Sequence, residues 1–337
     1  MVIKHSQYIK SKNNNVFNTG FCIVCNTPKF VKDFFRDVRY WEYPDKFEYW
    51  KCYKCGLIFQ KYVVKSNLGK YYENSSYWSQ DMDELKSKGL LDKYNWDKFG
   101  NIYKFIIENK KKGNILDIGC GSGNFLSMFN RKDWQVFGFD ISDFAGKTAL
   151  KYFNIKIFKP NDILKKNFKR KYDVITMLNS IEHFYEPLLY LERVKNVIKD
   201  DGYLIIQVPN ISSLGFLIFG KYWYPLQPGR HLFNFNPSNL KKLVEEFGFK
   251  VIKIDHFNKN HSIYGIFQSI RYINKGKRKE NQVVHINFEK EVLKKEKLPN
   301  EKYIFVVIAN LLSNIIYYLG AFLKKGEYIT IYAQREN

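Results

Sequence analysis

The sequence has little negative charge. It contains 33 aspartates and glutamates against 55 lysines and arginines, which gives a formal net charge of +22. The excess is carried mainly by lysine rather than by arginine, whose forked guanidinium group is favoured for recognising phosphates and bases. Because proteins that read RNA usually cluster their arginines, nucleic acid is disfavoured as a partner. A solvated lysine-rich surface, an acidic substrate and an anionic membrane face remain open as explanations.

The first residues, MVIKHSQYIK, lack the apolar run of a secretory signal. We therefore expect a reducing, cytoplasmic setting, and peripheral contact with the inner face of an anionic membrane stays open. The chain has 337 residues, 45% of them hydrophobic. That is enough for one large domain with a small appendage.

Cysteine is scarce, but four of the five cysteines fall into two pairs of equal spacing. Cys22 and Cys25 form one C-x-x-C turn, and Cys52 and Cys55 form the other. Zinc prefers four thiolates in a tetrahedron, and two such turns supply them. The sequence predicts a zinc-ribbon-like module over residues 1–62, in which a closed, structural zinc site contributes folding energy locally. Four unrelated buried thiols and a redox dithiol are the alternatives.

Residues 63–112 are predicted to form a helical connector or lid, with a helix from about residue 82 to residue 112. From residue 113 onward, strand and helix patterns alternate. This alternation predicts an α/β domain over residues 113–337, built on a doubly wound, mostly parallel seven-stranded sheet with insertions at about 209–236 and 257–325. Strands are expected at 114–118, 134–140, 155–159, 172–178, 203–208, 249–256 and 328–333.

The first of these strands runs into a glycine loop in ILDIGCGSGNF, residues 115–125, and a helix is expected over residues 124–131. Two absences define this loop. Asn124 stands where a dinucleotide-binding fingerprint has its third glycine, and no lysine followed by serine or threonine comes after it, which excludes a P-loop. The glycines fall instead at positions 119, 121 and 123, a spacing that suits close approach of the backbone to a ligand.

Acidic residues recur at the ends of three successive predicted strands, at Asp117, Asp140 and Asp162. The carboxyl ends of parallel strands meet at one edge of a sheet, where ligands bind. A carboxylate at the position of Asp140 can accept both hydroxyls of a ribose, and one at Asp162 can reach an adenine amino group. The three acids together indicate a nucleoside-binding edge.

These segments resemble the class I S-adenosylmethionine-dependent methyltransferases. The matching stretches are ILDIGCGSG, VFGFDIS, KPNDI and YDVITMLNSIEHFYEP, then GYLIIQVPN; they cover roughly residues 110–256, and GEYITIYAQRE resembles the last antiparallel strand of the family. The resemblance implies a Rossmann-like fold and S-adenosyl-L-methionine as cofactor, with the glycines under its methionine and ribose and acids at its ribose and adenine. The implied cofactor-binding residues are Asp117, Gly119, Cys120, Gly121, Gly123, Asp140, Ile141, Asp162, Ile163 and Asn179.

The stretch NSIEHF holds three candidates for handling the proton of an acceptor, Asn179, Glu182 and His183. It is similar to the E-x-x-E-H pattern of the ubiquinone-pathway O-methyltransferases, which is associated with a divalent cation. Asn179 replaces the first acid of that pattern, so the cation stays an open question. His231 is a further candidate base, because a similar stretch in polysaccharide-cluster methyltransferases forms one wall of the acceptor pocket.

One long run lacks charge altogether, YIFVVIANLLSNIIYYLGAF at residues 303–322. It is long enough to span a bilayer, but the predicted strand that follows has to return to the sheet, which a single crossing forbids. We expect a helix that either lies on a membrane face or is buried against the sheet. Earlier in the chain, Tyr71, Tyr72 and Tyr77 are candidates for a lid over the cofactor, with interdomain packing as the alternative.

The predicted function is methyl transfer from S-adenosylmethionine to a small or lipid-linked glycan acceptor, with a sugar hydroxyl as the expected target. A sulfonium methyl is already activated, so the protein has to align the acceptor, exclude water and remove a proton. Two alternatives remain: a zinc-ribbon RNA-binding protein or RNA methyltransferase, and a module that holds the cofactor without turnover. The effect of added salt distinguishes the RNA alternative from the predicted function, because RNA binding weakens steeply with salt and transfer to a neutral glycan does not.

Overall fold

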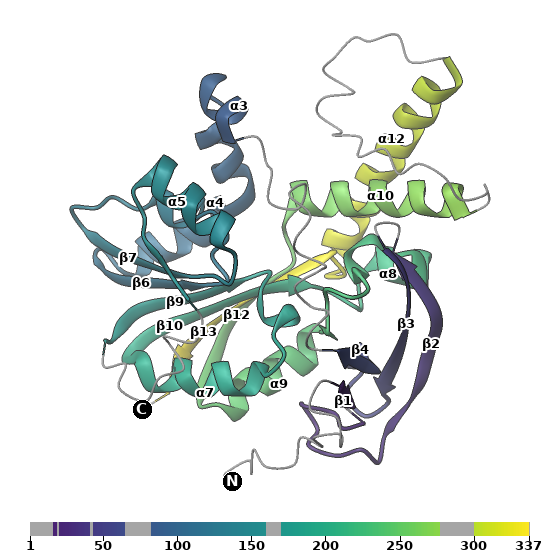
Figure 1. The fold of residues 1–337 in the computed structure, drawn as a ribbon, viewed down its shortest axis with the longest axis horizontal. Coiled ribbons are helices and arrows are strands. Elements are labelled where there is room, and N and C mark those ends of the chain that lie inside the picture. Colours follow the sequence, from purple (N-terminus) through teal and green to yellow (C-terminus); the bar gives the residue numbers. More distant parts are fainter. Residues whose placement is uncertain are drawn as a thin grey trace.

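The computed structural model describes residues 16–18, 20–40, 43–64, 82–159, 170–276 and 300–336. A seven-stranded sheet lies at its centre, with the strand order β8-β7-β6-β9-β10-β13-β12 (Figure 1). Its strands are β6 (Gly113–Ile118), β7 (Trp134–Phe139), β8 (Ile157–Phe158), β9 (Tyr172–Leu178), β10 (Ile198–Pro209), β12 (Phe249–Asp255) and β13 (Tyr328–Arg335).

All seven predicted strands are therefore confirmed, although β8 is shorter and β10 begins earlier than expected. The five strands β6, β7, β8, β9 and β10 run parallel to one another. β13 is antiparallel to both of its neighbours, β10 and β12. The first strand, β6, lies between β7 and β9, so the chain winds outward from it in both directions. Ligands of doubly wound sheets bind where the strand order reverses in this way.

Both faces of the sheet are covered by helices, as Figure 1 shows. Alternate strand residues face opposite sides: Leu116 and Ile175 belong to the core beside α7 (Pro187–Val197) and α9 (Pro237–Glu246). The residues that precede them, Ile115 and Val174, belong to the core beside α4 (Leu91–Asn109). The same side of the sheet also carries α5 (Asp143–Phe153). This double coverage explains why the strands read as continuous apolar runs.

Two predicted helices differ from the structure. The helix expected over residues 82–112 is divided into α3 (Met82–Ser87) and α4, because Gly89 adopts a φ of +64° between them. The helix expected over residues 124–131 is wrong: only a 3-10 turn, η3 (Leu126–Met128), forms there. The hydroxyl of Ser127 donates to the backbone oxygen of Asn124 at 2.7 Å, a local bond that competes with regular helix.

The amino-terminal cysteines belong to a second sheet, of order β11-β4-β3-β2. It consists of β2 (Val31–Tyr40), β3 (Tyr43–Cys52), β4 (Ile58–Gln60) and β11 (Phe233–Asn234). β1 (Val16–Asn18) and β5 (Tyr62–Val64) pair separately. Because β11 comes from the segment after β10, the amino-terminal module shares a sheet with the larger domain.

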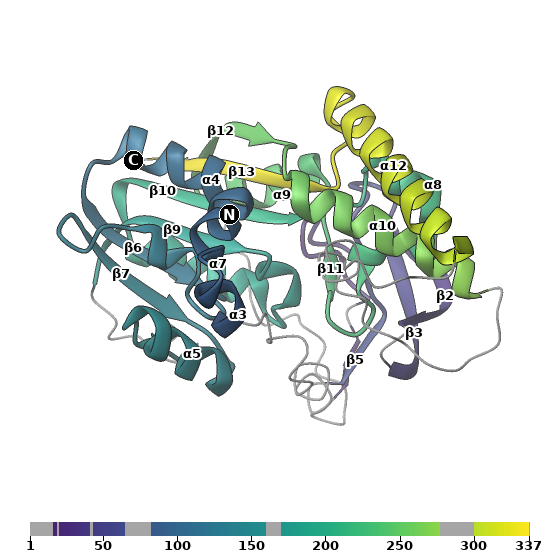
Figure 2. The same cartoon turned by 90° about the horizontal axis from the view of Figure 1, so that it is seen from above.

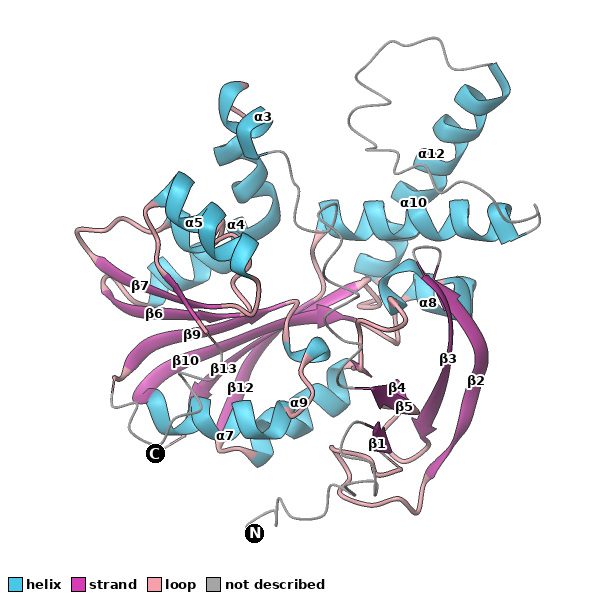
Figure 3. Ribbon diagram, viewed as in Figure 1, coloured by secondary structure: helices cyan, strands magenta, loops and turns pink. Residues whose placement is uncertain are grey.

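Three helices from the predicted insertions lie side by side, as Figure 2 shows from above: α8 (Leu214–Phe219), α10 (Lys259–Gly276) and α12 (Asn300–Phe322). Two short 3-10 turns, η5 (Gly220–Tyr222) and η6 (Tyr224–Leu226), connect α8 to the following loop. The helices share a buried cluster with β2 and β3, which Figure 3 shows curving toward α8. Within the described residues, Ile304–Phe322 of α12 is the one stretch of helix long and apolar enough to cross a membrane.

Candidate active site

The glycine loop after β6 has the backbone conformation that its spacing suggests. Gly119, Gly121 and Gly123 have φ values of +80°, +52° and +77°, all in the region that side chains rarely adopt. A Cβ atom on Gly119 would lie 2.3 Å from Cβ of Ser180 in the loop after β9, so no larger residue fits there. The loop therefore brings bare backbone to the carboxyl end of the sheet, at the point where the strand order reverses.

Asp140, at the end of β7, holds this loop in place. One carboxylate oxygen accepts a hydrogen bond from the backbone N–H of Gly121 at 2.8 Å, and the other accepts from the N–H of Ser142 at 2.9 Å. Burial raises the pKa of Asp140, while these two N–H groups favour its charged form. Ile141, next to it, exposes 72% of its surface and offers an apolar contact beside the carboxylate.

Asp117 and Cys120 lie beneath the loop rather than on its open side. Asp117 is buried and accepts a hydrogen bond from the hydroxyl of Thr176 at 2.7 Å, and burial raises its pKa to about 7. Cys120 is also buried, and burial raises the pKa of its thiol. A Cβ on Gly138 would lie 2.6 Å from Sγ of Cys120, so this thiol packs tightly against β7. Both side chains support the loop from below.

Five of the positions singled out in the sequence cannot be placed together with these. Asp162 and Ile163, the expected adenine contacts, lie outside the described residues, as do the tyrosines at 71, 72 and 77. Asn179 is described and directly follows β9 with a φ of +53°. Its backbone N–H donates to the oxygen of Gln207 at 2.8 Å, so this residue is fixed at the same edge of the sheet as the glycine loop.

Asn179 belongs to a network of polar side chains that the sequence did not reveal. Oε1 of Gln207 in β10 accepts from the amide of Asn258 at 3.1 Å and lies 3.4 Å from that of Asn179. The amide of Gln207 donates in turn to the hydroxyl of Thr330 in β13 at 2.9 Å. The amide of Asn258 also lies 3.3 Å from Nδ1 of His261, near the start of α10. Three strands and one helix thus contribute to a single polar wall.

His261 closes this wall. Burial lowers its pKa to about 3, and the positive charge of Lys98 in α4 acts in the same direction, so the imidazole is neutral at physiological pH. α4 and α10 are in contact with each other, and they bring Lys98 and His261 to one side of the site. The only sequence signal for this arrangement is the polar stretch NKNH ahead of an apolar helix, which has no specific meaning by itself.

A second cluster follows β9 directly. A carboxylate oxygen of Glu182 and one ring nitrogen each of His183 and His231 lie within 4.8 Å of one another, and the two rings meet edge to face at 4.6 Å between centroids. Glu182 and His231 are 1% and 3% exposed. Three of the four residues named from the sequence as candidates for proton transfer are therefore brought together, although His231 comes from a loop far along the chain.

The protonation of this cluster follows from its burial. Burial raises the pKa of Glu182 to about 8, lowers the pKa of His183 to about 4, and also lowers the pKa of His231 well below its usual value. Nδ1 of His231 lies 2.7 Å from the backbone oxygen of Pro225, which can only accept, so the proton sits on Nδ1 and Nε2 carries the lone pair. Within the described part of the chain, neither carboxylate oxygen of Glu182 has a hydrogen-bond partner. A buried carboxylate of this kind calls for a proton or a cation.

The four paired cysteines also converge. Their sulfur atoms all lie within 4.8 Å of one another, and those of Cys22 and Cys55 are 3.5 Å apart. Each C-x-x-C turn ends in a residue with positive φ, Asn26 at +51° and Gly56 at +77°, and both of these donate their N–H back to the oxygen of the first cysteine. Two turns of the same geometry facing one another fit the tetrahedral four-thiolate environment of zinc.

Electrostatics in the cysteine cluster support the same assignment. The hydrogen bond between the two sulfurs raises the pKa of Cys22 and lowers that of Cys55 to about 5, while burial raises the pKa of Cys25 to about 12. Four thiolates at this distance repel one another unless a cation lies between them, and a coordinating thiol loses its proton outright. The donor set therefore suits a doubly charged soft metal.

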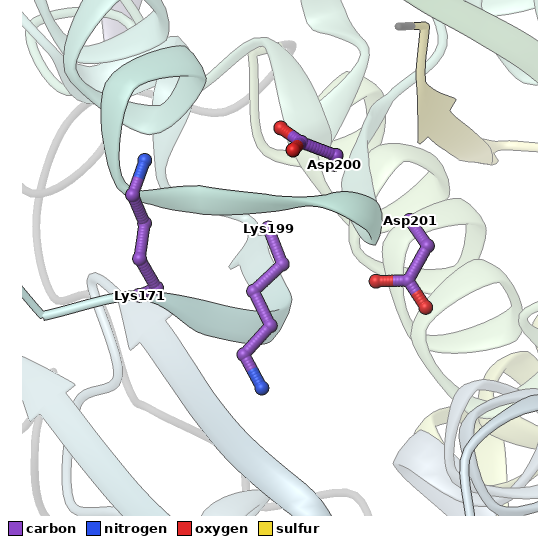
Figure 4. A pocket seen from close by; sticks show the side chains of 4 residues that line it. All are labelled: Lys171, Lys199, Asp200 and Asp201. Carbon is purple, nitrogen blue, oxygen red and sulfur yellow. The ribbon is translucent and has the colours of Figure 1, made fainter.

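One further pocket lies at the opposite edge of the sheet. Figure 4 shows its lining residues, Lys171, Lys199, Asp200 and Asp201, at the starts of β9 and β10. Lys199 pairs with Asp173 at 2.8 Å, and Asp201 pairs with Lys110. Because these groups compensate one another and lie at the amino ends of the strands, this pocket is separate from the ligand-binding edge.

The chain is similar to several known proteins. A family model described as a methyltransferase domain matches residues 94–254. The ubiquinone biosynthesis O-methyltransferase of Glaesserella parasuis is 27% identical over 209 residues, which cover 53% of this chain and 89% of that protein. An uncharacterized protein of Methanocaldococcus jannaschii is 33% identical over 180 residues, covering 49% of this chain and 82% of that protein. A SAM-dependent methyltransferase structure from Archaeoglobus fulgidus has a TM-score of 0.46 at 20% identity, covering 75% of this chain and 98% of that chain.

The sheet order and the glycine loop define a Rossmann-like methyltransferase fold. With the family match over the same residues, the chain belongs to the class I S-adenosylmethionine-dependent methyltransferases, and it is an enzyme of that class. The resemblance seen in the motifs is thereby confirmed at the level of the family.

Proposed function

We propose that this enzyme transfers a methyl group from S-adenosylmethionine to a hydroxyl oxygen of a small or lipid-linked glycan acceptor. The observation that carries the proposal is the buried group of Glu182, His183 and His231 immediately after β9, the strand whose end also bears Asn179. An oxygen nucleophile has to lose a proton during transfer, and this cluster supplies groups able to take it.

The cofactor would lie across the glycine loop. The turn at Gly119 and Gly121 leaves room for the methionine and ribose parts, because neither glycine has a side chain and Cys120 between them packs against β7. Asp140 would accept the ribose hydroxyls, and Ile141 would contact the adenine. The carboxylate already binds two backbone N–H groups, which hold its orientation for that task.

Transfer would form a bond from the acceptor oxygen to the methyl carbon and break the bond from that carbon to the sulfonium sulfur, which would keep the electron pair and leave as the neutral thioether, S-adenosylhomocysteine. The acceptor hydroxyl would have to give its proton to a group of the protein. Nε2 of His231 is a suitable acceptor, because the backbone oxygen of Pro225 fixes the proton on Nδ1. Burial lowers the pKa of His231, so this imidazole is neutral at physiological pH and Nε2 carries its lone pair. The polar wall of Gln207, Asn258 and His261 would orient the other hydroxyls of the acceptor by hydrogen bonds.

The same cluster fits a divalent cation. Glu182 has two buried carboxylate oxygens without partners among the described residues, and a nitrogen from each histidine ring lies close to them. Glu182, His183 and His231 would be the ligands. A cation bound there would lower the pKa of an acceptor hydroxyl and fix its position. Carboxylate and imidazole ligands are compatible with several first-row metals.

The role of the cysteine cluster is structural in this proposal. Cys22, Cys25, Cys52 and Cys55 would hold one zinc ion with all four positions filled. Such a site leaves no position for a substrate, so zinc would stabilise the small sheet without taking part in transfer.

The relatives support an oxygen acceptor, since several are named as ubiquinone biosynthesis O-methyltransferases. The test is incubation of the enzyme with labelled S-adenosylmethionine and lipid, glycan and RNA extracts, followed by identification of the labelled product. We expect label in a glycan or lipid-linked fraction, little change with added salt, and a large loss of transfer in Glu182→Gln and His231→Asn with cofactor binding retained. Salt-sensitive labelling of RNA, or unchanged transfer in both variants, would contradict the proposal.

A metal assay separates the two roles of the cluster. Calorimetry with manganese or zinc on the wild type and Glu182→Gln measures binding without turnover. If a cation takes part, the variant loses one binding event while the zinc held by the four cysteines remains. If it does not, metal content is the same in both proteins and only proton transfer is affected.

A further inference from the structure

Helix α12 exposes large apolar residues, unlike a helix whose outer side faces water. Its fully buried residues are Ala309, Ser313, Tyr317, Gly320 and Ala321, and Phe305, Val306, Asn310, Asn314 and Ile316 are partly buried. Its exposed side consists of large apolar residues. These are Ile304, Val307, Ile308, Leu311, Leu312, Ile315, Tyr318, Leu319 and Phe322.

The spacing of the exposed residues shows that they form one stripe. They recur at intervals of three and four, so they follow a single side of the helix for about 28 Å at 1.5 Å per residue. Leu311 and Phe322 are 61% and 84% exposed. A continuous stripe of large apolar residues on the exposed side of a helix is the pattern of a helix whose outer medium is lipid rather than water.

The stripe is continued by neighbouring elements. α12 contacts α8, where Leu217 and Ile218 are 60% and 51% exposed, and α8 leads into the exposed Tyr222. We call the stripe and these three residues the α12 surface. An apolar area of this extent is uncommon on a protein that remains free in solution and marks an interaction site.

The exposed charged side chains on the described parts of α8, α10 and α12 and their nearest connections are positive. Residues 211–234, 257–276 and 304–326, which form α8, α10, the described side chains of α12 and their nearest connections, contain no aspartate or glutamate. They do contain lysines, and Lys259 lies over the ring of Tyr318 at 5.5 Å. Lys221, Lys324 and Lys325 are also exposed. Lysines bordering an apolar stripe complement the anionic headgroups of a lipid bilayer.

We propose that the α12 surface docks this enzyme onto an anionic lipid bilayer, with α12 lying in the interface and its apolar stripe among the acyl chains. A second copy of the chain fits less well. In a two-fold dimer each stripe would meet its own copy, so the bordering lysines would approach like charges without any acid from these segments to pair with. Headgroup phosphates supply the missing negative charge.

The docking surface is connected to the active site by α10. The first turn of α10 carries His261 in the polar wall, and its length packs against α12. Membrane docking would therefore bring the acceptor side of the site near the bilayer. This consequence rests on the proposed function, because it explains how a lipid-linked acceptor reaches the enzyme; the docking itself does not depend on the acceptor.

The test is cosedimentation of the full-length protein with phosphatidylcholine vesicles and with mixed phosphatidylcholine–phosphatidylglycerol vesicles. We expect binding to the anionic vesicles that weakens with salt, since each lysine contributes about 1 kcal/mol, which is roughly fivefold. Leu311→Glu combined with Ile315→Glu should weaken binding by at least about tenfold. Leu150→Glu is the matched control, because Leu150 is 55% exposed on α5, away from this surface, and should bind as the wild type does.

Two further measurements on the same proteins make the result decisive. Calorimetry with S-adenosylmethionine should give the same affinity for the wild type and the α12 variants, so loss of vesicle binding is separated from loss of folding and from failure of the proposed function. Light scattering gives the oligomeric state. Absence of vesicle binding by the wild type, or a dimer that Leu311→Glu dissociates while vesicle binding is unchanged, would overturn the proposal.

Discussion

The side-chain amide of Asn236 donates a hydrogen bond to the backbone oxygen of Cys55, 181 residues earlier in the chain, at 3.0 Å. The amide of Asn239 reaches the same oxygen at 3.3 Å, and these two asparagines also form the capping box that begins α9. One turn of the cysteine cluster is thus held against a helix of the methyltransferase domain. The cluster supports more of the molecule than its own module.

Because of this contact, replacing a cysteine of the cluster should affect the stability of more than the amino-terminal module. Cys52→Ser removes one ligand, so bound zinc should fall and hydrogen exchange should accelerate in residues 20–64, the local effect that the sequence predicts. Because β11 pairs with β4 and α9 contacts Cys55, we also expect faster exchange in Phe233–Asn234 and the first turn of α9. Cys120→Ser is the control and should keep the zinc content. Exchange changes confined to residues 20–64 would contradict the wider effect.

Asp140 is expected to control cofactor affinity. Asp140→Asn keeps the size of the side chain but removes the charge that would meet the ribose, and its amide group is wrongly placed for one of the two backbone N–H donors. Charge-assisted hydrogen bonds contribute about 1.5–3 kcal/mol each, so calorimetry should show S-adenosylmethionine binding weakened by at least about tenfold. Asp143→Asn, on the exposed start of α5, should leave the affinity unchanged. Equal affinity in the wild type and Asp140→Asn would refute the ribose assignment.

Two glycines test the requirement for a bare loop. Gly119→Ala would place a Cβ 2.3 Å from Ser180 at a φ of +80° and should lower the free energy of unfolding by about 2–4 kcal/mol and abolish cofactor binding. In Gly146→Ala, within α5, the added Cβ would lie no closer than 3.8 Å to a neighbouring element. The free energy of unfolding should therefore rise by about 0.5–1 kcal/mol through better helix propensity. Urea unfolding and calorimetry measure both. Similar behaviour of the two variants would show that the loop tolerates a side chain.

Glu327 is a buried acid away from the active site that should affect stability through pH. It accepts hydrogen bonds from the indole of Trp223 at 2.5 Å and the N–H of Gly215 at 2.8 Å, yet burial raises its pKa from 4.5 to about 7. Between these two pH values the folded protein retains a proton that the unfolded chain has released. Stability therefore decreases as the pH rises through this window, by roughly 3 kcal/mol in all.

The measurement is urea unfolding of the wild type and Glu327→Gln from pH 4.5 to pH 8. Glutamine does not titrate, so the variant should lack this part of the pH dependence. The stability of the wild type relative to the variant should fall as the pH rises toward 7 and level off above it. Parallel curves for the two proteins would show that Glu327 is ionised throughout.

The sequence predicts the middle of the central sheet well because strands there are buried on both faces and read as apolar runs between breaks, as Tyr172–Leu178 does. Local chemistry defeats the helix predictions at two places: the hydroxyl of Ser127 binds nearby backbone in place of a regular helix, and Gly89 adopts a positive φ that divides α3 from α4. The glycine loop and the cysteine pairs can be predicted because each is defined by a short, fixed spacing of residues along the chain.

Long-range contacts could not be predicted in the same way. The network from Asn179 through Gln207 to Asn258 and His261 joins three parts of the chain by single hydrogen bonds, and amides carry no periodic signal. The pairing of β11 with β4 involves only two residues of β11, Phe233 and Asn234. His231 was named by resemblance, and its position beside His183 appears only in three dimensions. The site assignments themselves stay predictions until ligand binding is measured.

The position of β13 between β10 and β12 has a consequence for synthesis of the protein. Among the described strands, β12 is hydrogen-bonded to β13 alone, yet the ribosome delivers β13 after both of its neighbours. Until Tyr328 and the residues after it emerge, a growing chain presents two unpaired strand edges, which can recruit neighbouring chains. Translation that stalls upstream of this strand should yield aggregates rather than a smaller enzyme, so the late stretch of the message decides the yield of soluble protein.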